Sequence, residues 1–278
     1  MRKIGLIAGA GELPISLARH CQSVGRPLFV IRLNGFASPD LGAFDGADVG
    51  VAELGKGFAA LRSSGCVSVC FAGAISRPNL AALKPDARGL LALPGALKAG
   101  RGGDDALLTY LLGEFEKEGF AVEGAHEVRG DLVLGEGAAG RHAPGPDHQI
   151  DIDRALDAAR AIGRLDAGQA AVACDGLILA LEAQEGTDAM LARVARLPSA
   201  IRGEAAARRG VLAKACKPGQ ERRIDMPTIG PSTVRLAAQA GLAGIVGEVD
   251  RLLVVDRDAV IAAADALGLF VFGAPDVR

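Results

Sequence analysis

Residues 214–233 combine a cluster of cations with an acid, Asp225, that follows two arginines in a proline-rich frame, the pattern in this chain that points most directly to chemistry. Between Arg202 and Arg223 there are seven Lys and Arg residues and only two Glu, whereas the whole chain has a net charge of −2. Clustered Lys and Arg side chains bind phosphate oxygens strongly. Three prolines limit the backbone freedom of this segment around Asp225. We therefore predict a phosphate-binding loop with Asp225 at its centre.

Hydrolysis of a diphosphate needs cations and magnesium for the developing charge, and a carboxylate that orients water or holds the metal. The cluster supplies the cations and Asp225 the carboxylate. The predicted substrate ligands of this loop are Lys214, Lys217, Arg222, Arg223 and Thr228. The alternative is that Asp225 only pairs with one of the two neighbouring arginines.

A second group of acids lies in the segment EAQEGTD at 182–188, which the sequence places between a strand and a helix. A helix N-terminus beside carboxylates can hold a metal-bound diphosphate. We predict Thr187 and Asp188 as substrate ligands and Asp188 also as a magnesium ligand. In the alternative reading Asp188 caps the helix and the glutamates are solvated.

A glycine turn follows the first apolar run of the chain, in a position where backbone amides approach phosphates. Its predicted substrate-binding residues are Gly9, Ala10, Gly11, Glu12 and Leu13. A dinucleotide fingerprint would have a third glycine where this chain has Pro14, and an acid where it has Arg32. The turn therefore favours a phosphate or nucleotide contact over a dinucleotide site, and a tight packing turn is the alternative.

A similar turn follows the run Cys66–Ala72, and its predicted substrate-binding residues are Gly73, Ala74, Ile75 and Arg77. Ligands usually bind at the carboxyl ends of parallel strands, which is where this turn is expected. Further on, Gly103-Asp104-Asp105 opens a helix. Aspartate there is commonly a cap, but paired carboxylates also suit Mg²⁺. We predict Asp104 as a metal ligand together with Asp188 and Asp225.

Alternating strands and helices must position these residues in the first half of the chain. Strands separated by helices of ordinary length are typical of right-handed βαβ units. The predicted strands are Lys3–Ala8, Pro27–Leu33, Asp48–Ala52 and Cys66–Ala72, and the predicted helices are Leu13–Val24, Phe58–Ser64, Asp86–Ala99 and Asp104–Glu118. We expect a Rossmann-like, parallel-sheet, substrate-binding domain over residues 1–134.

A stretch rich in glycine and proline, GEGAAGRHAPGPDHQ at 135–149, is predicted to be a linker to a mixed α/β catalytic domain at 150–278. In that domain Asp175-Gly176 predicts a hairpin, because a type I′ turn needs positive φ at both positions. Pro231 marks a helix start and Gly241 a helix end. The other predicted elements are helices Asp151–Ile162, from Thr187 and from Asp258, and strands Gln169–Cys174, Leu177–Glu182, Val211–Cys216, Gly244–Glu248, Leu252–Val255 and Leu269–Phe272.

The composition excludes several classes of protein. The 278 residues include 38 Gly, one Tyr and no Trp, which suits packed α/β layers and argues against a nucleic-acid reader. Five cysteines without a CxxC pair fit a reducing compartment, and the four histidines show no metal-ligand spacing. The longest stretch without Asp, Glu, Lys or Arg is residues 63–76. It is shorter than the roughly 20 residues of a membrane span.

Seven strings spread over nearly the whole chain resemble one family, the UDP-2,3-diacylglucosamine diphosphatases of lipid A biosynthesis that are unrelated to the calcineurin-like enzymes. They are IGLIAGAGELP, FAGAISRP, GDDALL, DAGQAAV, LEAQEGTDAML, LAKACKPGQERRIDMPTIGPSTV and ADALGLFVFG. Asp225 matches the acid of the family's D-P-TIGP motif, and Glu185–Asp188 match its Glu-Gly-Thr-Asp string. Glu221 departs from the pattern, because we expect Asp there more often.

The resemblance implies Mg²⁺-dependent hydrolysis of UDP-2,3-diacylglucosamine to UMP and 2,3-diacylglucosamine 1-phosphate (lipid X), with attack on the phosphorus attached to the sugar. It also implies two domains, a homodimer, and work in the cytoplasm at the inner membrane, as a peripheral protein without a nucleic-acid partner. Two alternatives stay open. One is an NADP-dependent oxidoreductase that uses Gly9–Gly11 and Arg32, and the other is a non-catalytic lipid or nucleotide carrier.

Overall fold

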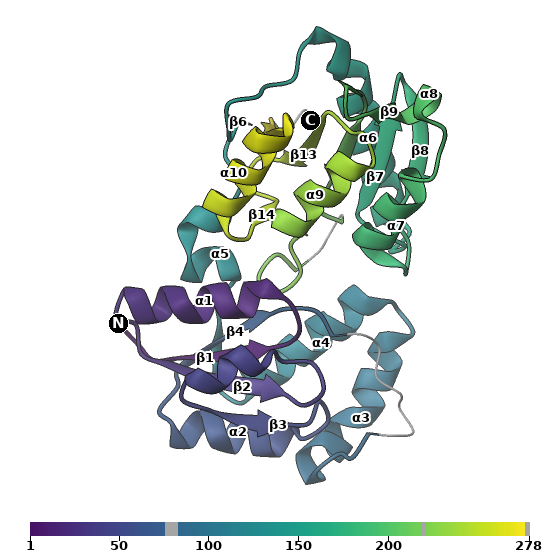
Figure 1. The fold of residues 1–278 in the computed structure, drawn as a ribbon. Helices are drawn as coiled ribbons and strands as arrows, with labels where there is room; N and C mark the ends of the chain where they lie inside the picture. Colours follow the sequence, from purple (N-terminus) through teal and green to yellow (C-terminus); the bar gives the residue numbers. More distant parts are fainter. Residues whose placement is uncertain (76–82, 218–220, 276–278) are drawn as a thin grey trace. The chain divides into compact units, whose positions relative to one another are not determined.

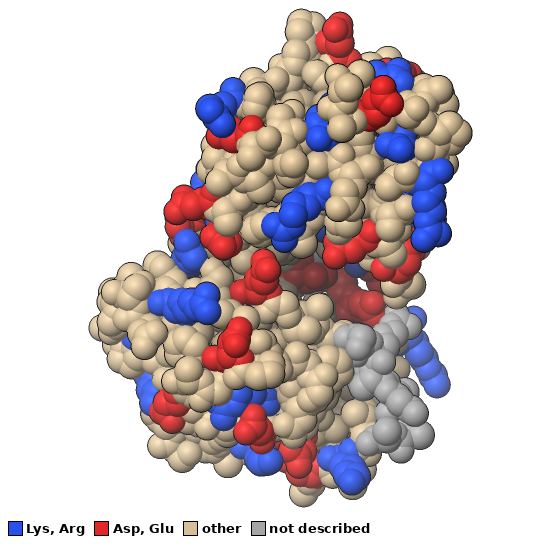
Figure 2. Space-filling view, in the orientation of Figure 1, with Lys and Arg blue, Asp and Glu red and all other residues tan. Residues whose placement is uncertain are grey.

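The computed structural model describes residues 1–75, 83–217 and 221–275, and the chain forms two compact units. Unit 1 comprises residues 1–130 together with 221–225, and unit 2 comprises 131–220 together with 226–278. Both units are α/β, as predicted (Figure 1). On the face shown in Figure 2, acidic and basic side chains are interspersed, in keeping with the small net charge.

Unit 1 is built on a five-stranded parallel sheet in the order β3-β2-β1-β4-β5. Its strands are β1 Ile4–Ala8, β2 Leu28–Leu33, β3 Gly46–Val49, β4 Ser68–Ala72 and β5 Ala121–Val122. Its helices are α1 Glu12–Ser23, α2 Leu54–Ser63, α3 Ala87–Gly100, α4 Asp104–Lys117 and α5 Ala125–Val128, with the 3-10 turn η1 Pro39–Ala43. The core includes the aromatic cluster of Phe58, Phe115 and Phe120. The Rossmann-like prediction is confirmed.

Strand β3 begins two residues earlier and ends three residues earlier than predicted. The predicted strand ran to Ala52, but the Glu53 carboxylate accepts a hydrogen bond from the Gly50 amide at 2.7 Å and fixes a turn there. Helix α2 then begins at Leu54. The Glu53 side chain that forms the turn lies outside the apolar run, so hydrophobicity alone places the end of the strand too late.

Unit 2 is built on a mixed six-stranded sheet in the order β6-β15-β13-β11-β7-β8. The three central strands β15, β13 and β11 are parallel, and β6, β7 and β8 are antiparallel to their neighbours. The strands are β6 Gly137–Ala138, β7 Ala170–Cys174, β8 Leu177–Leu181, β11 Val211–Lys214, β13 Gly244–Glu248 and β15 Phe270–Ala274.

Helices cover both faces of this sheet. Helix α6 (Gln149–Arg164) packs on one face through Ile152, Ala155 and Leu156. Helices α7 (Gly186–Val194), α9 (Pro231–Gln239) and α10 (Arg257–Leu267) pack on the other. The smaller elements are α8 Ser199–Arg202, the strand pairs β9 Gly203–Glu204 with β10 Ala207–Arg208 and β12 Thr228–Ile229 with β14 Leu253–Val254, and the 3-10 turns η3 Gly130–Leu132 and η4 Pro146–His148.

The predicted linker at 135–149 lies within unit 2, which takes up the chain at residue 131. Residues 137–138 form β6 and pair with β15, and residues 131–134 also belong to unit 2. The glycines and prolines of this segment correctly indicated an irregular path. Strand β6 could not be predicted, because a strand of two residues leaves no hydrophobic pattern in the sequence. The hairpin prediction holds, since Asp175 and Gly176 have φ of 51° and 76°. No helix in the described part of the chain is long and apolar enough to span a membrane.

Candidate active site

The two predicted glycine turns lie next to each other in unit 1. Strands β1 and β4 are neighbours in the sheet. The connection after β1 leads to β2 on one side, and the connection after β4 leads to β5 on the other side. Ligands are therefore expected beside the carboxyl ends of β1 and β4. The Ala10 amide donates to the Ala74 carbonyl at 2.8 Å, and the Ala74 amide donates to the Ala10 carbonyl at 2.9 Å. The structure therefore brings both turns to the switch point of the sheet (Figure 1).

Two of the predicted glycines serve this contact between the turns. A Cβ at Gly9 would lie 2.7 Å from the Ala74 carbonyl oxygen, and one at Gly73 would lie 2.5 Å from that of Ala10. The Gly73 φ of 90° also favours glycine. The amides of Gly9, Ala10 and Ala74 donate to backbone carbonyls, so the prediction that they bind phosphate needs correcting. The amides of Glu12 and Leu13 belong to the first turn of α1, where helix geometry leaves N–H groups without an intrahelical acceptor.

The segment around Asp225 belongs to unit 1, although the chain on both sides of it belongs to unit 2. The Ile224 and Asp225 amides both donate to the Glu221 carbonyl, at 3.1 and 3.2 Å, and form a tight turn. The Ile224 side chain packs against the core of unit 1. The Glu221 amide donates to the Asp105 carboxylate of α4 at 3.3 Å. Asp225 is thus half-buried at the end of an anchored turn.

Arg223 holds this turn rather than extending toward a ligand. Its Nε and Nη2 atoms donate to the two Glu221 oxygens at 2.9 and 2.8 Å, and its Nη1 donates to Glu116 at 2.9 Å. The hydrogen-bonded Arg223 guanidinium lowers the pKa of Glu221, and Glu221 in turn raises the pKa of Arg223. The predicted role of Arg223 in a phosphate clamp is therefore corrected to a brace. Glu221 and Glu116 were absent from the predicted site, because only the fold brings them to Arg223.

Lys214 of β11 is the buried cation of unit 2, with 4% of its surface exposed. Its ammonium donates to Thr187 Oγ1 at 2.9 Å and to the Thr228 carbonyl at 3.1 Å. The Thr187 hydroxyl donates onward to Glu182 at 2.7 Å, and Glu182 also accepts from the Gln169 amide at 2.9 Å. Three residues predicted as substrate ligands, Lys214, Thr187 and Thr228, thus form one internal network. Glu182, which is 6% exposed, completes it and was not predicted as a site residue.

The remaining predicted ligands of unit 2 are Lys217 and Asp188. The Lys217 ammonium donates to Asp166 at 2.6 Å, in an ion pair between two half-buried residues. Asp188 is exposed in the first turn of α7. The alternative reading of Asp188 as the cap of this helix is wrong, because the N-cap residue is Glu185 and no side chain makes a capping hydrogen bond.

The predicted site residues divide between the units. Unit 1 holds the glycine turns, Asp104, Arg222, Arg223 and Asp225, and unit 2 holds Lys214, Lys217, Thr187, Asp188 and Thr228. Arg222 and Ile75 are exposed. Arg77 lies outside the described residues.

Comparison with known proteins identifies the family. Two family models match, the LpxI N-terminal domain over residues 3–132 and the LpxI C-terminal domain over residues 135–272. The chain belongs to the LpxI family. It is 64% identical over 273 residues to a Caulobacter vibrioides protein named UDP-2,3-diacylglucosamine pyrophosphatase LpxI, a match that covers 98% of each chain.

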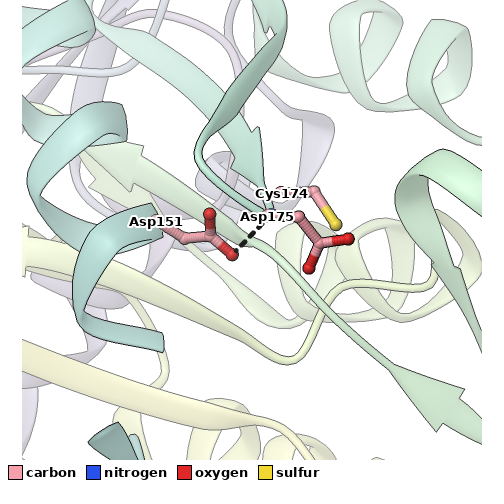
Figure 3. Close-up of side chains that lie close together, drawn as sticks. All are labelled: Asp151, Cys174 and Asp175. Atoms are coloured by element: carbon pink, nitrogen blue, oxygen red, sulfur yellow. Dashed lines mark hydrogen bonds between the residues drawn. The ribbon is translucent and has the colours of Figure 1, made fainter. Parts of the chain in front are cut away.

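Within this LpxI family chain, one cluster of possible metal ligands was not predicted. Among the described residues, Asp151, Cys174 and Asp175 form a group whose ligand atoms lie within 4.8 Å of one another (Figure 3). The Asp151 carboxylate, however, accepts from the amides of Asp175 and Gly176 at 3.1 and 2.7 Å, and Asp175 pairs with Arg209 at 2.5 Å. Burial raises the pKa of Cys174 to about 11, which disfavours the thiolate. The cluster therefore stabilises the β7–β8 turn.

Arg32 does not suit the NADP alternative. Its Nε donates to Asp48 at 2.9 Å and its Nη1 to the Phe44 carbonyl at 3.2 Å, so a carboxylate stands where a 2′-phosphate would bind. An open hollow of about 440 Å³ lies beside this pair, at the carboxyl end of β2. It is lined by Arg32, Leu33, Asn34, Gly35, Ala37, Ser38, Pro39, Gly42 and Asp48.

Proposed function

We propose that this chain hydrolyses the diphosphate of UDP-2,3-diacylglucosamine to UMP and lipid X, as a step of lipid A biosynthesis. The observation that carries the proposal is the 64% identity, over 98% of both chains, to the Caulobacter vibrioides protein named for that substrate. The quoted motifs around Glu185–Asp188 and Asp225 lie within the matched family models.

Asp225 is the proposed catalytic residue. Its backbone position is fixed by the Glu221 turn and by the packing of Ile224 in unit 1. A carboxylate held in this way can orient a water molecule and accept its proton while the water attacks phosphorus. The brace formed by Glu221 and Arg223 keeps the carboxylate from moving with the flanking chain.

The proposed cofactor is Mg²⁺, with Asp225 and Asp104 of unit 1 as ligands. Carboxylate oxygens are the donors that Mg²⁺ prefers, and this ion is usually held by one or two carboxylates plus substrate phosphates and waters. Both proposed ligands are carboxylates, and the first turn of α4 places Asp104 beside Asp105, which accepts a hydrogen bond from the Glu221 amide. When bound, Mg²⁺ would neutralise charge on the diphosphate.

Substrate binding is proposed for the first turn of α1 and for the exposed cation Arg222. The polar hollow at the end of β2 is a fitting place for the nucleoside. Lys214 and Lys217 are assigned a supporting role, because both ammonium groups donate to protein oxygens. We further propose that the protein works in the cytoplasm at the inner membrane as a peripheral homodimer, and the two acyl chains of the substrate support the membrane location.

The test is incubation with UDP-2,3-diacylglucosamine and Mg²⁺ in ¹⁸O-labelled water. We expect UMP and lipid X, with the label in the phosphate of lipid X. Asp225→Ala should remove turnover while the substrate still binds, and Asp147→Ala, a change of another aspartate in the η4 turn, is the matched control. Turnover near that of the unchanged chain in Asp225→Ala would overturn the role of Asp225. A lack of hydrolysis by the unchanged chain would overturn the proposed function.

A further inference from the structure

Helix α3 packs on its own unit through small residues. Its two buried positions are Gly89 and Ala92. The Tyr110 hydroxyl of α4 donates to the Ala92 carbonyl at 3.0 Å, and Gly95 lies so close to the Tyr110 ring that a Cβ there would collide with it. The inner side of α3 is therefore too crowded for large side chains.

Three of the four leucines of α3, a helix labelled in Figure 1, lie on its exposed side instead. Leu91 is 77% exposed, Leu90 60% and Leu97 44%, and Pro94 is exposed between them. Positions 90, 91, 94 and 97 follow the three-to-four-residue spacing that places side chains on one face of a helix. A surface helix usually has the opposite arrangement, and a contiguous exposed apolar face marks an interaction site.

The charge at this face identifies the kind of partner. The same spacing continues from Pro94 to the exposed Lys98 and Arg101, and there is no acid between residues 87 and 101. The other base of the helix, Arg88, donates to Glu114 and Glu118 of α4. Exposed leucines beside exposed cations fit the boundary of an anionic lipid layer, where apolar groups enter the acyl region and cations meet phosphates.

We propose that α3 is the surface by which this protein docks on an anionic membrane, with Leu90, Leu91 and Leu97 inserted and Lys98 and Arg101 at the headgroups. The proposal rests on the proposed function, because a substrate with two acyl chains is held in a membrane. It assigns membrane contact to one helix, separate from the Asp225 turn.

The test is flotation of the purified full chain with vesicles of phosphatidylethanolamine and phosphatidylglycerol. The unchanged chain should float with the vesicles. The double variant Leu90→Gln and Leu91→Gln should bind about tenfold or more weakly, because two inserted side chains become polar. Glutamine has a helix propensity close to that of leucine, so α3 should stay folded.

The matched control is Leu165→Gln with Leu177→Gln in unit 2, because these leucines are 78% and 62% exposed. This control should float like the unchanged chain, and an equal loss in both double variants would overturn the proposal. The charge variant Lys98→Gln with Arg101→Gln should lose binding to the anionic vesicles, whereas Arg154→Gln with Arg196→Gln should not. Unchanged flotation of the α3 variants would also overturn it.

Hydrolysis of UDP-2,3-diacylglucosamine dispersed in detergent separates the remaining explanations. We expect the α3 leucine variant to keep its kcat and KM in detergent. A raised KM with unchanged flotation would assign the leucines to the substrate's acyl chains, and a changed mass in sedimentation with unchanged flotation would assign them to a second copy. Either result would overturn the proposal. Flotation is scored from protein alone, so a failure of the proposed function would be seen separately as absent hydrolysis.

Discussion

The Lys214 ammonium donates a hydrogen bond to the Thr187 hydroxyl at 2.9 Å, and this contact joins strand β11 to the start of α7. The Thr187 hydroxyl donates in turn to the Glu182 carboxylate, and the Lys214 ammonium also donates to the Thr228 carbonyl. A buried cation is costly unless it is paired and hydrogen-bonded. The network therefore fixes both the Glu-Gly-Thr-Asp string and the exit from the Asp225 loop.

Thr187→Val should destabilise the protein by about 2–3 kcal/mol, because Lys214 loses an acceptor and Glu182 loses a donor. Thr187→Ser should recover most of that loss. Urea unfolding measures both. The matched control is Thr228→Val, since Thr228 serves Lys214 through its backbone and its hydroxyl donates only to the Met226 carbonyl. Equal losses for the valine variants at 187 and 228 would contradict a special role for the network.

Gly73→Ala should be much more harmful than Gly11→Ala. Both glycines have positive φ, 90° and 99°, so both variants are strained by about 1–3 kcal/mol. A Cβ at Gly73 also meets the Ala10 carbonyl and Pro14, whereas a Cβ at Gly11 meets nothing within 4 Å. The collision should add about 1–3 kcal/mol at position 73 alone. Chemical denaturation of the two variants checks this, and equal stability would argue against close packing of the turns.

Glu221→Gln should weaken the turn that carries Asp225, by about 1 kcal/mol at neutral pH, because the pair with Arg223 is partly exposed. The pKa of Glu221 is lowered in the folded state, so its contribution is present above the unfolded pKa and is lost as the pH falls through the folded one. The stability difference from the unchanged chain should therefore be constant near pH 7 and shrink below about pH 4.5. Unfolding curves at several pH values measure it. A difference that grows in acid would refute this reading.

Asp151→Ala should cost about 1–3 kcal/mol in stability, because two turn amides lose their shared acceptor. Asp151→Asn keeps one oxygen and should cost less. Neither change should alter Mg²⁺ binding followed by calorimetry, since the carboxylate serves the Asp175-Gly176 turn. A marked loss of Mg²⁺ affinity in Asp151→Asn, with stability retained, would show instead that Asp151, Cys174 and Asp175 form a metal site.

Local signals predicted the elements well. Pro231 begins α9, Gly241 follows its end with a φ of 78°, and Asp175-Gly176 forms the expected hairpin turn. Each of these depends on backbone preferences of one or two residues. The β-branched and small residues of β1, β4, β7 and β13 likewise made buried strands visible.

The site was predicted less completely, because its contacts join distant parts of the chain. Counting cations between Arg202 and Arg223 could not show that Arg223 is held by Glu116 or Lys217 by Asp166. Strand alternation indicates that Lys214 and Ala213 point to opposite faces, but it does not indicate which face holds Thr187. Residue types thus indicated candidate segments, whereas only the fold shows which of their side chains are paired with other protein groups.

Residues 221–225 pack with unit 1 although the chain on both sides of them belongs to unit 2, and this limits how the protein can be divided. Asp225 lies in the second half of the sequence but belongs to unit 1, which is otherwise formed by residues 1–130. A fragment that ends near residue 130 would lack the segment 221–225 that packs on it. A fragment that starts there would carry Asp225 without the α4 contact that holds its turn. A single cut therefore cannot separate the two units without dividing one of them.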